Sequence, residues 1–161
     1  MLKTSLVALT ALLASTASAQ DAPPPNYVAV FAGTTLAYYP NGGPWDGHQK
    51  DAVLTAGIGR YVTAKTALEV DFGPTLISGD YAAFSIVPGV VYQFSPHAYL
   101  AARFPIAVDP DTAVYAAPGF GLSHTFKNNL TPTLEFNGVT RLDENQGDFG
   151  VSVTVGLMYS F

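Results

Sequence analysis

Cysteine is absent from the sequence, and so is any long apolar run beyond the N-terminal region. Without cysteine we expect neither a disulfide framework nor a lipid anchor on an N-terminal cysteine. After residue 19 no run approaches the roughly 20 apolar residues that a membrane-spanning helix needs. Any insertion into a membrane is therefore expected to use strands closed into a barrel, because a bilayer tolerates no unpaired backbone groups.

Basic residues are also scarce. Seven Lys and Arg stand against twelve Asp and Glu, which gives a formal net charge of −5 at pH 7. Proteins that bind nucleic acid neutralise phosphates with clustered Lys and Arg. We therefore expect no nucleic acid partner. The sequence also predicts no cofactor.

The N-terminal region predicts export. Met1-Leu-Lys3 is a short basic start, residues 6–14 are apolar, and Ala17-Ser-Ala19 has the small residues of a cleavage site. These features predict a secretory signal peptide over residues 1–19, which is too short for a membrane helix. Residues 20–26 are proline-rich and are expected to form a tail outside the sheet, because proline cannot donate to a ladder.

The C-terminal stretch alternates with a period of two residues. Large apolar side chains occupy every second position, namely Phe149, Val151, Val153, Val155, Leu157, Tyr159 and Phe161. The residues between them are small or polar, apart from Met158. Successive side chains of a strand point to opposite faces, so this pattern predicts one long strand. Its length suits a tilted membrane strand, which needs about 9–11 residues.

This ending resembles the terminal signal by which bacterial outer-membrane barrels are recognised for assembly, with Tyr159 and Phe161 in the aromatic positions. The rest of the chain is similar in pattern to the small OmpA/OmpX-type, porin-like barrels. The resemblance implies the outer membrane of a Gram-negative bacterium, with its lipids, its lipopolysaccharide and the barrel-assembly machinery as partners.

Eight segments of alternating hydrophobicity predict an all-β fold, an eight-stranded antiparallel up-and-down transmembrane barrel over residues 27–161. The expected strands are 27–39, 52–62, 66–76, 83–94, 98–107, 113–126, 131–141 and 149–161. Short connections at 63–65, 95–97 and 127–129 alternate with longer ones at 40–51, 77–82, 108–112 and 142–148. Short turns of such barrels face the periplasm and longer loops face outside.

The apolar face of these strands is expected to face lipid. Ionisable residues share the small face, where charges can pair. Aromatic residues gather near strand ends and predict two girdles: Phe94, Phe126, Tyr159 and Phe161 at the short turns, and Tyr38, Phe84 and Phe149 at the longer loops. Prolines 74, 88, 105, 118 and 132 are expected on the lipid face, each at the cost of one ladder bond or a bulge.

Inward charges form the first candidate site. Asp71, Arg103 and Glu135 each lie six residues after a short turn, so three strands deliver them to a similar depth. Glu69 is expected just below them and Arg141 nearer the outside. Since an eight-stranded barrel is only wide enough for its own side chains, one interpretation is an ion-paired plug that fills the lumen. The other is a narrow polar path for ions or small solutes.

The longer loops form the second candidate site. Eight of the twelve carboxylates lie in or beside them: Asp46, Asp51, Asp80, Asp109, Asp111, Asp143, Glu144 and Asp148. This acidic rim is interpreted as a solvated surface bridged by divalent cations to anionic lipid, or as a site for an extracellular ligand with Trp45 as aromatic anchor. Asp46 and His48 belong to the same stretch, but they lack the spacing of a metal site, and we predict no metal.

An enzyme is the least favoured interpretation. Some outer-membrane barrels modify lipid acyl chains and need a nucleophile beside a base. Ser123 and His124 are adjacent on a strand, so their side chains point to opposite faces and form no dyad. We predict no catalytic residues. The sequence favours a structural or surface-interaction barrel, with a narrow low-conductance pore as the alternative and an outer-leaflet lipid-modifying enzyme as the less favoured one.

Overall fold

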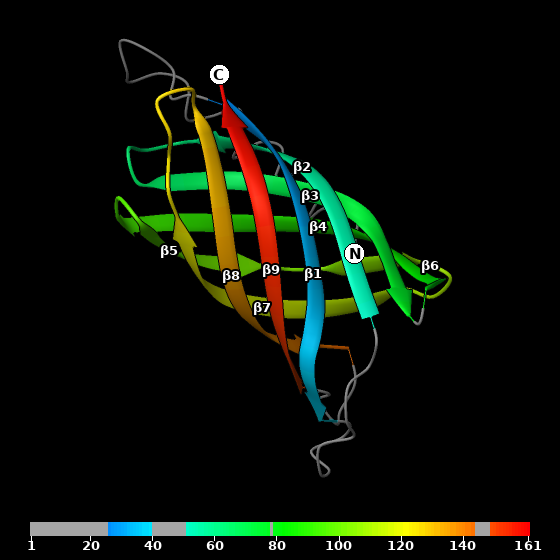
Figure 1. Cartoon of the computed structure of the whole chain (residues 1–161). Coiled ribbons are helices and arrows are strands. Elements are labelled where there is room, and N and C mark those ends of the chain that lie inside the picture. The colour runs from blue at the N-terminus through cyan, green and yellow to red at the C-terminus, as the bar shows by residue number, and fades with distance from the viewer. Residues whose placement is uncertain (1–25, 40–50, 78, 144–148) are drawn as a thin grey trace.

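The chain folds into a single antiparallel sheet that closes on itself (Figure 1). The computed structural model describes residues 26–39, 51–77, 79–143 and 149–161. Its strands are β1 (Asn26–Tyr39), β2 (Asp51–Tyr61), β3 (Thr66–Ile77), β4 (Asp80–Ser95), β5 (Ala98–Arg103), β6 (Ile106–Asp109), β7 (Ala113–Ser123), β8 (Leu130–Arg141) and β9 (Phe149–Ser160). β1 pairs with both β2 and β9, which closes the barrel.

Eight strands make up the wall, because β5 and β6 are two parts of one. Both pair with β4 on one side and with β7 on the other. The predicted fold class, an eight-stranded antiparallel up-and-down barrel, is thereby confirmed. Among the described segments, none is a helix with the length and apolar character needed to cross a membrane. The predicted signal peptide and nearly all of the proline-rich tail lie outside the described residues.

The two ends of the barrel differ. One end carries both Asn26 and Phe161 together with the connections 62–65, 96–97 and 124–129, and is called the short-turn end below. Asn26 belongs to β1 rather than to the tail: its N–H donates to the carbonyl of Phe161 at 3.0 Å, and it accepts from the N–H of Phe161 at 2.8 Å. The opposite end is called the long-loop end.

One predicted connection at the long-loop end is wrong. Ile77 pairs directly with Asp80, so β4 begins at residue 80 and the expected loop over 77–82 is a tight hairpin. Gly79 has a φ of +93°, a backbone conformation that glycine adopts without steric cost. The glycine therefore allows β3 to turn straight into β4.

Pro105 interrupts the fifth strand of the wall. β5 ends at Arg103 and β6 begins at Ile106, yet the flanking bonds persist: the N–H of Phe104 donates to Pro88 at 2.9 Å, and the carbonyl of Pro105 accepts from Tyr115 at 2.8 Å. Pro105 lines the interior, so its predicted place on the lipid face is wrong. The other four prolines lie within continuous strands.

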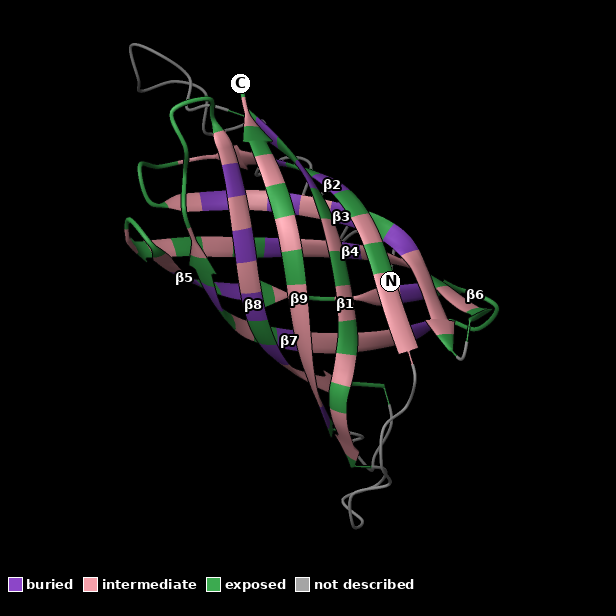
Figure 2. Ribbon diagram, in the orientation of Figure 1, coloured by how far each residue is buried: buried purple, intermediate pink, exposed green. Residues whose placement is uncertain are grey.

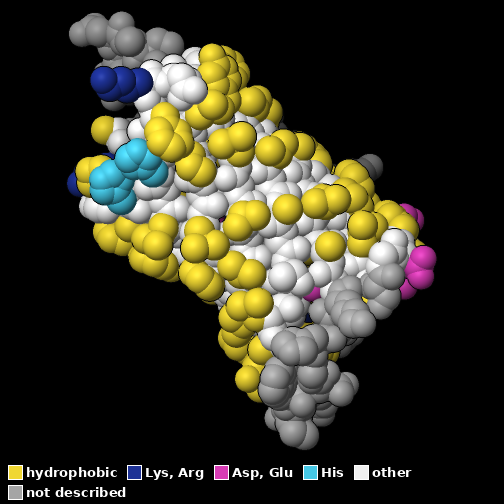
Figure 3. All heavy atoms as spheres, viewed as in Figure 1, with side chains coloured by type: hydrophobic (Ala, Val, Ile, Leu, Met, Phe, Trp, Pro, Cys, Tyr) yellow, Lys and Arg dark blue, Asp and Glu magenta, His cyan; other side chains and the backbone are white. Residues whose placement is uncertain are grey.

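The outer surface of the barrel is apolar. Buried and exposed residues alternate along the strands (Figure 2), and the exposed set includes Ile58, Leu100 and Phe120. In Figure 3 hydrophobic side chains cover the visible wall, while Lys, Arg and His gather at one end and Asp and Glu at the other. Such a continuous apolar surface is far larger than the patches that soluble monomers expose. The predicted outward placement of the apolar face is confirmed.

The aromatic girdles are confirmed with one correction. Phe94, Phe126, Tyr159 and Phe161 are exposed near the short-turn end, and Phe84 and Phe149 are exposed toward the long-loop end. Tyr38 was predicted among the latter, but the β1–β9 register shifts between Thr35 and Ala37. This bulge reverses the alternation, so Tyr38 lines the interior and Tyr39 lies outside, 6.2 Å from the ring of Phe149.

Candidate functional site

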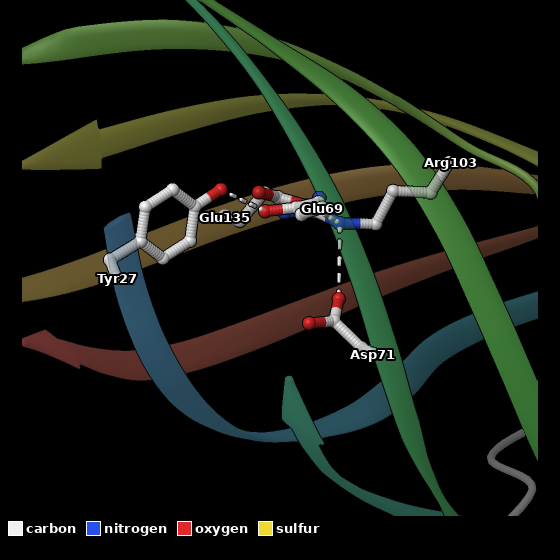
Figure 4. A network of polar contacts seen from close by, with 5 residues as sticks. All are labelled: Tyr27, Glu69, Asp71, Arg103 and Glu135. Atoms are coloured by element: carbon white, nitrogen blue, oxygen red, sulfur yellow. Dashed lines mark hydrogen bonds and ion pairs between the residues drawn. The ribbon is translucent and has the colours of Figure 1, made fainter. Parts of the chain in front are cut away.

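Arg103 lies at the centre of a buried network that crosses the lumen (Figure 4). Its Nε donates to Oε1 of Glu69 at 2.6 Å, and its Nη1 pairs with Oε1 of Glu135. Asp71 is more distant, with its Oδ2 3.8 Å from the same Nε. Because these residues come from β3, β5 and β8, one guanidinium joins distant parts of the wall. The four residues together are called the Arg103 network below.

Aromatic side chains complete this network, and sequence reasoning missed them. The hydroxyl of Tyr27 donates to Oε2 of Glu69 at 2.8 Å, and Tyr27 is only 2% exposed. The guanidinium carbon of Arg103 lies 5.7 Å from the centre of the Phe31 ring, within the range of a cation–π contact. The alternation of side chains along β1 could have identified them, since Tyr27 and Phe31 occupy inward positions of that strand.

Glycines make room for these side chains. In the sheet register Tyr27 on β1 lies opposite Gly59 on β2, and Gly59 lies opposite Glu69 on β3. A Cβ on Gly59 would collide with the Tyr27 ring, so the ring lies over the glycine and reaches the glutamate. The second half repeats this row, with Tyr99 over Gly121 and then Glu135.

This repeated arrangement of tyrosine, glycine and glutamate reflects an internal repeat in the sequence, which the alternation of apolar and polar side chains does not reveal. Each of four short motifs occurs twice, once in the first half of the barrel and once in the second, in the same order. With x for any residue, the pairs are Tyr27-x-Ala29-x-Phe31 and Tyr99-x-Ala101-x-Arg103; Gly57-x-Gly59 and Gly119-x-Gly121; Leu68-Glu69-x-Asp71 and Leu134-Glu135-x-Asn137; Gly89-x-x-Tyr92-x-Phe94 and Gly156-x-x-Tyr159-x-Phe161. The barrel thus consists of two similar halves of four strands each. Phe31 and Arg103 hold equivalent positions and contact one another inside the barrel.

The Arg103 network separates two cavities. The larger, about 500 Å³, extends from the network to the strand ends at the long-loop end and is called the vestibule below. The smaller, about 60 Å³, lies toward the short-turn end. Both touch Phe31 and Arg103. Among the described residues, side chains therefore close the lumen in its middle and leave cavities on either side, whereas the sequence predicted side chains throughout. Many of the residues that line the vestibule are small, because eleven are alanine, serine or threonine and two are glycine.

Charges within the Arg103 network do not balance. Three carboxyl groups, those of Glu69, Asp71 and Glu135, face a single guanidinium, and their side chains are at most 5% exposed. Oε2 of Glu135 and Oδ1 of Asn137 are buried and have no hydrogen-bond partner within the described part of the chain. Buried acceptors without partners are costly, so the network has room for an additional donor.

Arg141, the fifth predicted member of the lumen network, lines the vestibule near its outer rim. Its Nε donates to Oδ1 of Asp143 at 2.8 Å. This hydrogen bond holds the pKa of the Asp143 carboxyl below its usual value. The structure therefore places Arg141 beside Asp143 at the long-loop end, whereas Arg103 pairs with Glu69, Asp71 and Glu135.

The acidic rim is partly described. Asp51 accepts from the N–H of Thr35 at 2.7 Å and from its hydroxyl at 2.5 Å, and Asp109 accepts from the hydroxyl of Tyr81 at 2.5 Å. These carboxylates therefore fasten strand ends to one another. The candidate loop residues Trp45, Asp46 and His48 lie outside the described residues, as do Glu144 and Asp148.

Two further candidates lie at the short-turn end. Ser123 lines the smaller cavity, whereas His124 is exposed and lies against His97 and Phe126, with ring centroids 5.5 and 4.9 Å apart. The serine and the histidine thus face opposite sides of the wall, although β7 ends at Ser123 and the histidine lies just beyond it. Tyr159 and Phe161, the proposed assembly signal, are exposed side by side with their centroids 6.5 Å apart.

The closed eight-stranded wall, its apolar exterior and its charged interior define the fold of a small transmembrane β-barrel. No protein-family model matches the chain, and no curated protein matches it in sequence. Solved structures do resemble it. One is the N-terminal β-barrel domain of Pseudomonas aeruginosa OprF, with a TM-score of 0.59 and 16% identity over 85% of this chain and 98% of that one.

Another similar structure comes from the de novo design of transmembrane β-barrels. Its TM-score is 0.55 at 17% identity, and the match covers 89% of this chain and all of the designed one. At such identities the likeness concerns the fold alone. The function of this chain is therefore inferred from its own residues.

Proposed function

We propose that the protein is an integral barrel of the outer membrane of a Gram-negative bacterium, closed in its middle by the Arg103 network. The observation that carries this proposal is the guanidinium of Arg103, which contacts carboxylates from β3 and β8 inside an apolar-walled barrel. The basic and apolar start of the chain and its Tyr159 and Phe161 ending support export and assembly. The protein acts as a wall component that presents its loops at the surface.

In this role its partners are outer-membrane lipids, lipopolysaccharide, the barrel-assembly machinery and a ligand bound at the loops. Tyr159 and Phe161 contact the assembly machinery, and the acidic rim meets anionic lipid through divalent cations. The small barrel needs no cofactor for this function. Enzymatic activity is not part of the proposal, because Ser123 and His124 face opposite sides of the wall. Altered acylation of lipid A in cells that overproduce the protein would refute this last point.

Planar-bilayer recording tests closure of the lumen. The chain without residues 1–19 is refolded, and folding is verified by its mobility on an unboiled gel. We expect no discrete current steps from the folded wild type. Steps from folded wild type at neutral pH would refute a closed wall component.

A narrow pore is the second candidate, favoured by the cavities on both sides of the Arg103 network. On this alternative the network is a gate, and Arg103 sets ion selectivity. Arg103→Gln would then change the ratio of cation to anion permeability while Asp109→Asn, at the exposed rim, would not. If neither the Arg103→Gln variant nor the Asp109→Asn variant conducts, the pore alternative is wrong.

A further inference from the structure

The vestibule has buried carboxylates at the end formed by the Arg103 network, and the proposed function assigns no ligand to them. Its floor is formed by Asp71, Arg103, Glu135 and Asn137, and its volume of about 500 Å³ is in the range of pockets that hold small molecules. The walls above the floor carry the apolar side chains of Val53, Ile77, Val87, Ala107, Ala117 and Val139 among serine and threonine side chains, and Asp51 and Arg141 lie toward the rim. A chamber with aliphatic wall patches thus ends on a polar, carboxylate-rich floor.

The floor contains buried hydrogen-bond acceptors that lack a partner within the described chain. Oε2 of Glu135 and Oδ1 of Asn137 are buried without partners within the described chain, and both residues are less than one-tenth exposed. Nε and Nη1 of Arg103 already engage Glu69 and Glu135. Asp71 lies 3.8 Å from the guanidinium, so it is the most weakly paired carboxylate of the network. A ligand that donates hydrogen bonds and brings positive charge would complement these acceptors.

We propose that the vestibule binds a small molecule with a protonated amine and an apolar body. An ammonium group carries three donors and no acceptor, which complements Asp71, Glu135 and Asn137. Its positive charge offsets the excess of carboxylates over guanidinium, and its apolar body lies against the aliphatic walls. The residues of the binding site all belong to the described strands.

Neither an anion nor a bare metal ion fits the floor as well. An anion at the floor would lie beside Asp71 and Glu135, whose negative charge would repel it. Among the described residues no group of three or more His, Asp or Glu side chains is arranged to hold a metal ion. A bare ion would also leave the apolar walls without a partner. The combination of wall and floor selects an organic cation.

Benzylamine, benzyl alcohol and benzoate are suitable probes, because they share a ring and differ in charge. Binding to the folded barrel in detergent micelles is measured by titration calorimetry, with protein-free micelles subtracted. We expect saturable binding of benzylamine, and binding of the alcohol and of benzoate that is weaker by about tenfold or more, as expected for loss of a charged hydrogen bond.

Three variants locate the site. Asp71→Asn should weaken benzylamine by about tenfold or more, whereas the same change at the exposed rim, Asp109→Asn, should leave affinity unchanged. Ala83→Phe occupies part of the vestibule without altering charge and should weaken binding, which provides a test even if Asp71→Asn does not fold. Equal binding of benzyl alcohol, no saturable binding to the folded wild type, or unchanged affinity in Ala83→Phe would each overturn the proposal.

Discussion

Replacing Arg103 with methionine should destabilise the barrel strongly. Methionine keeps most of the length of the side chain and removes the guanidinium, which leaves Glu69 and Glu135 buried without their cation. Their side chains are 2% and 4% exposed, so water does not replace the lost partner. Removing one partner of a buried ion pair costs about 3–5 kcal/mol. We expect a loss of this size in the free energy of unfolding.

Urea unfolding in lipid vesicles, followed by the gel mobility of unboiled samples, measures this difference. Arg60→Met is the matched control, because Arg60 shares the outward face of β2 with Ile58 and its removal should cost less than about 1 kcal/mol. Adding Glu69→Gln and Glu135→Gln to the Arg103 variant should restore part of the stability, since Asp71 is then the one carboxylate of the network left without the guanidinium. An Arg103 variant as stable as the wild type would refute the network as the centre of the interior.

Two further predictions concern the glycines and the rim. Gly59→Ala should destabilise by about 1–3 kcal/mol, because the new methyl group collides with the Tyr27 ring, whereas Gly150→Ala, whose nearest neighbour would lie 3.5 Å away, should change little. The same urea assay compares them, and equal effects would contradict the close packing. The folded-state pKa of Asp143 is lowered by Arg141, so the pair stabilises the rim above the usual carboxylate pKa and is lost as pH falls through the lowered value. An NMR titration should show the lowered pKa returning to normal in Arg141→Gln, and an unperturbed pKa in the wild type would contradict the pairing.

Most of the wall follows from alternation alone. Each strand has an apolar and a small or polar face, and a one-residue error would place the wrong face in contact with lipid, so the pattern determines orientation. Alternation does not predict the structure where a residue breaks the pattern. The bulge after Thr35 turns Tyr38 inward, and Pro105 divides the fifth strand without opening the wall. Neither event has a signature in the period of the pattern, because both depend on pairing between strands.

The inward charges could be predicted only as a group. Their depth along each strand follows from counting residues after the short turns, and the structure does bring Glu69, Asp71, Arg103 and Glu135 together. Which carboxylates pair with Arg103 depends on side-chain reach across the lumen, which a sequence pattern does not contain. The tyrosines above Gly59 and Gly121 could have been found, since the repeat of the motifs around them indicates that the two halves share one internal design.

The central claim is that the apolar face of the barrel contacts lipid while the opposite face encloses the Arg103 network and the vestibule. Ile86 and Val87 test it directly, because they are neighbours on β4 at the same depth and lie on opposite faces; Val87 lines the vestibule, which has space for a larger side chain. In a Trp45→Phe background, Ile86→Trp and Val87→Trp are refolded into vesicles of lipids brominated near the middle of their acyl chains. The account predicts strong quenching of the fluorescence of Ile86→Trp and little quenching of Val87→Trp. Equal quenching of the two variants, or quenching of neither, would contradict it.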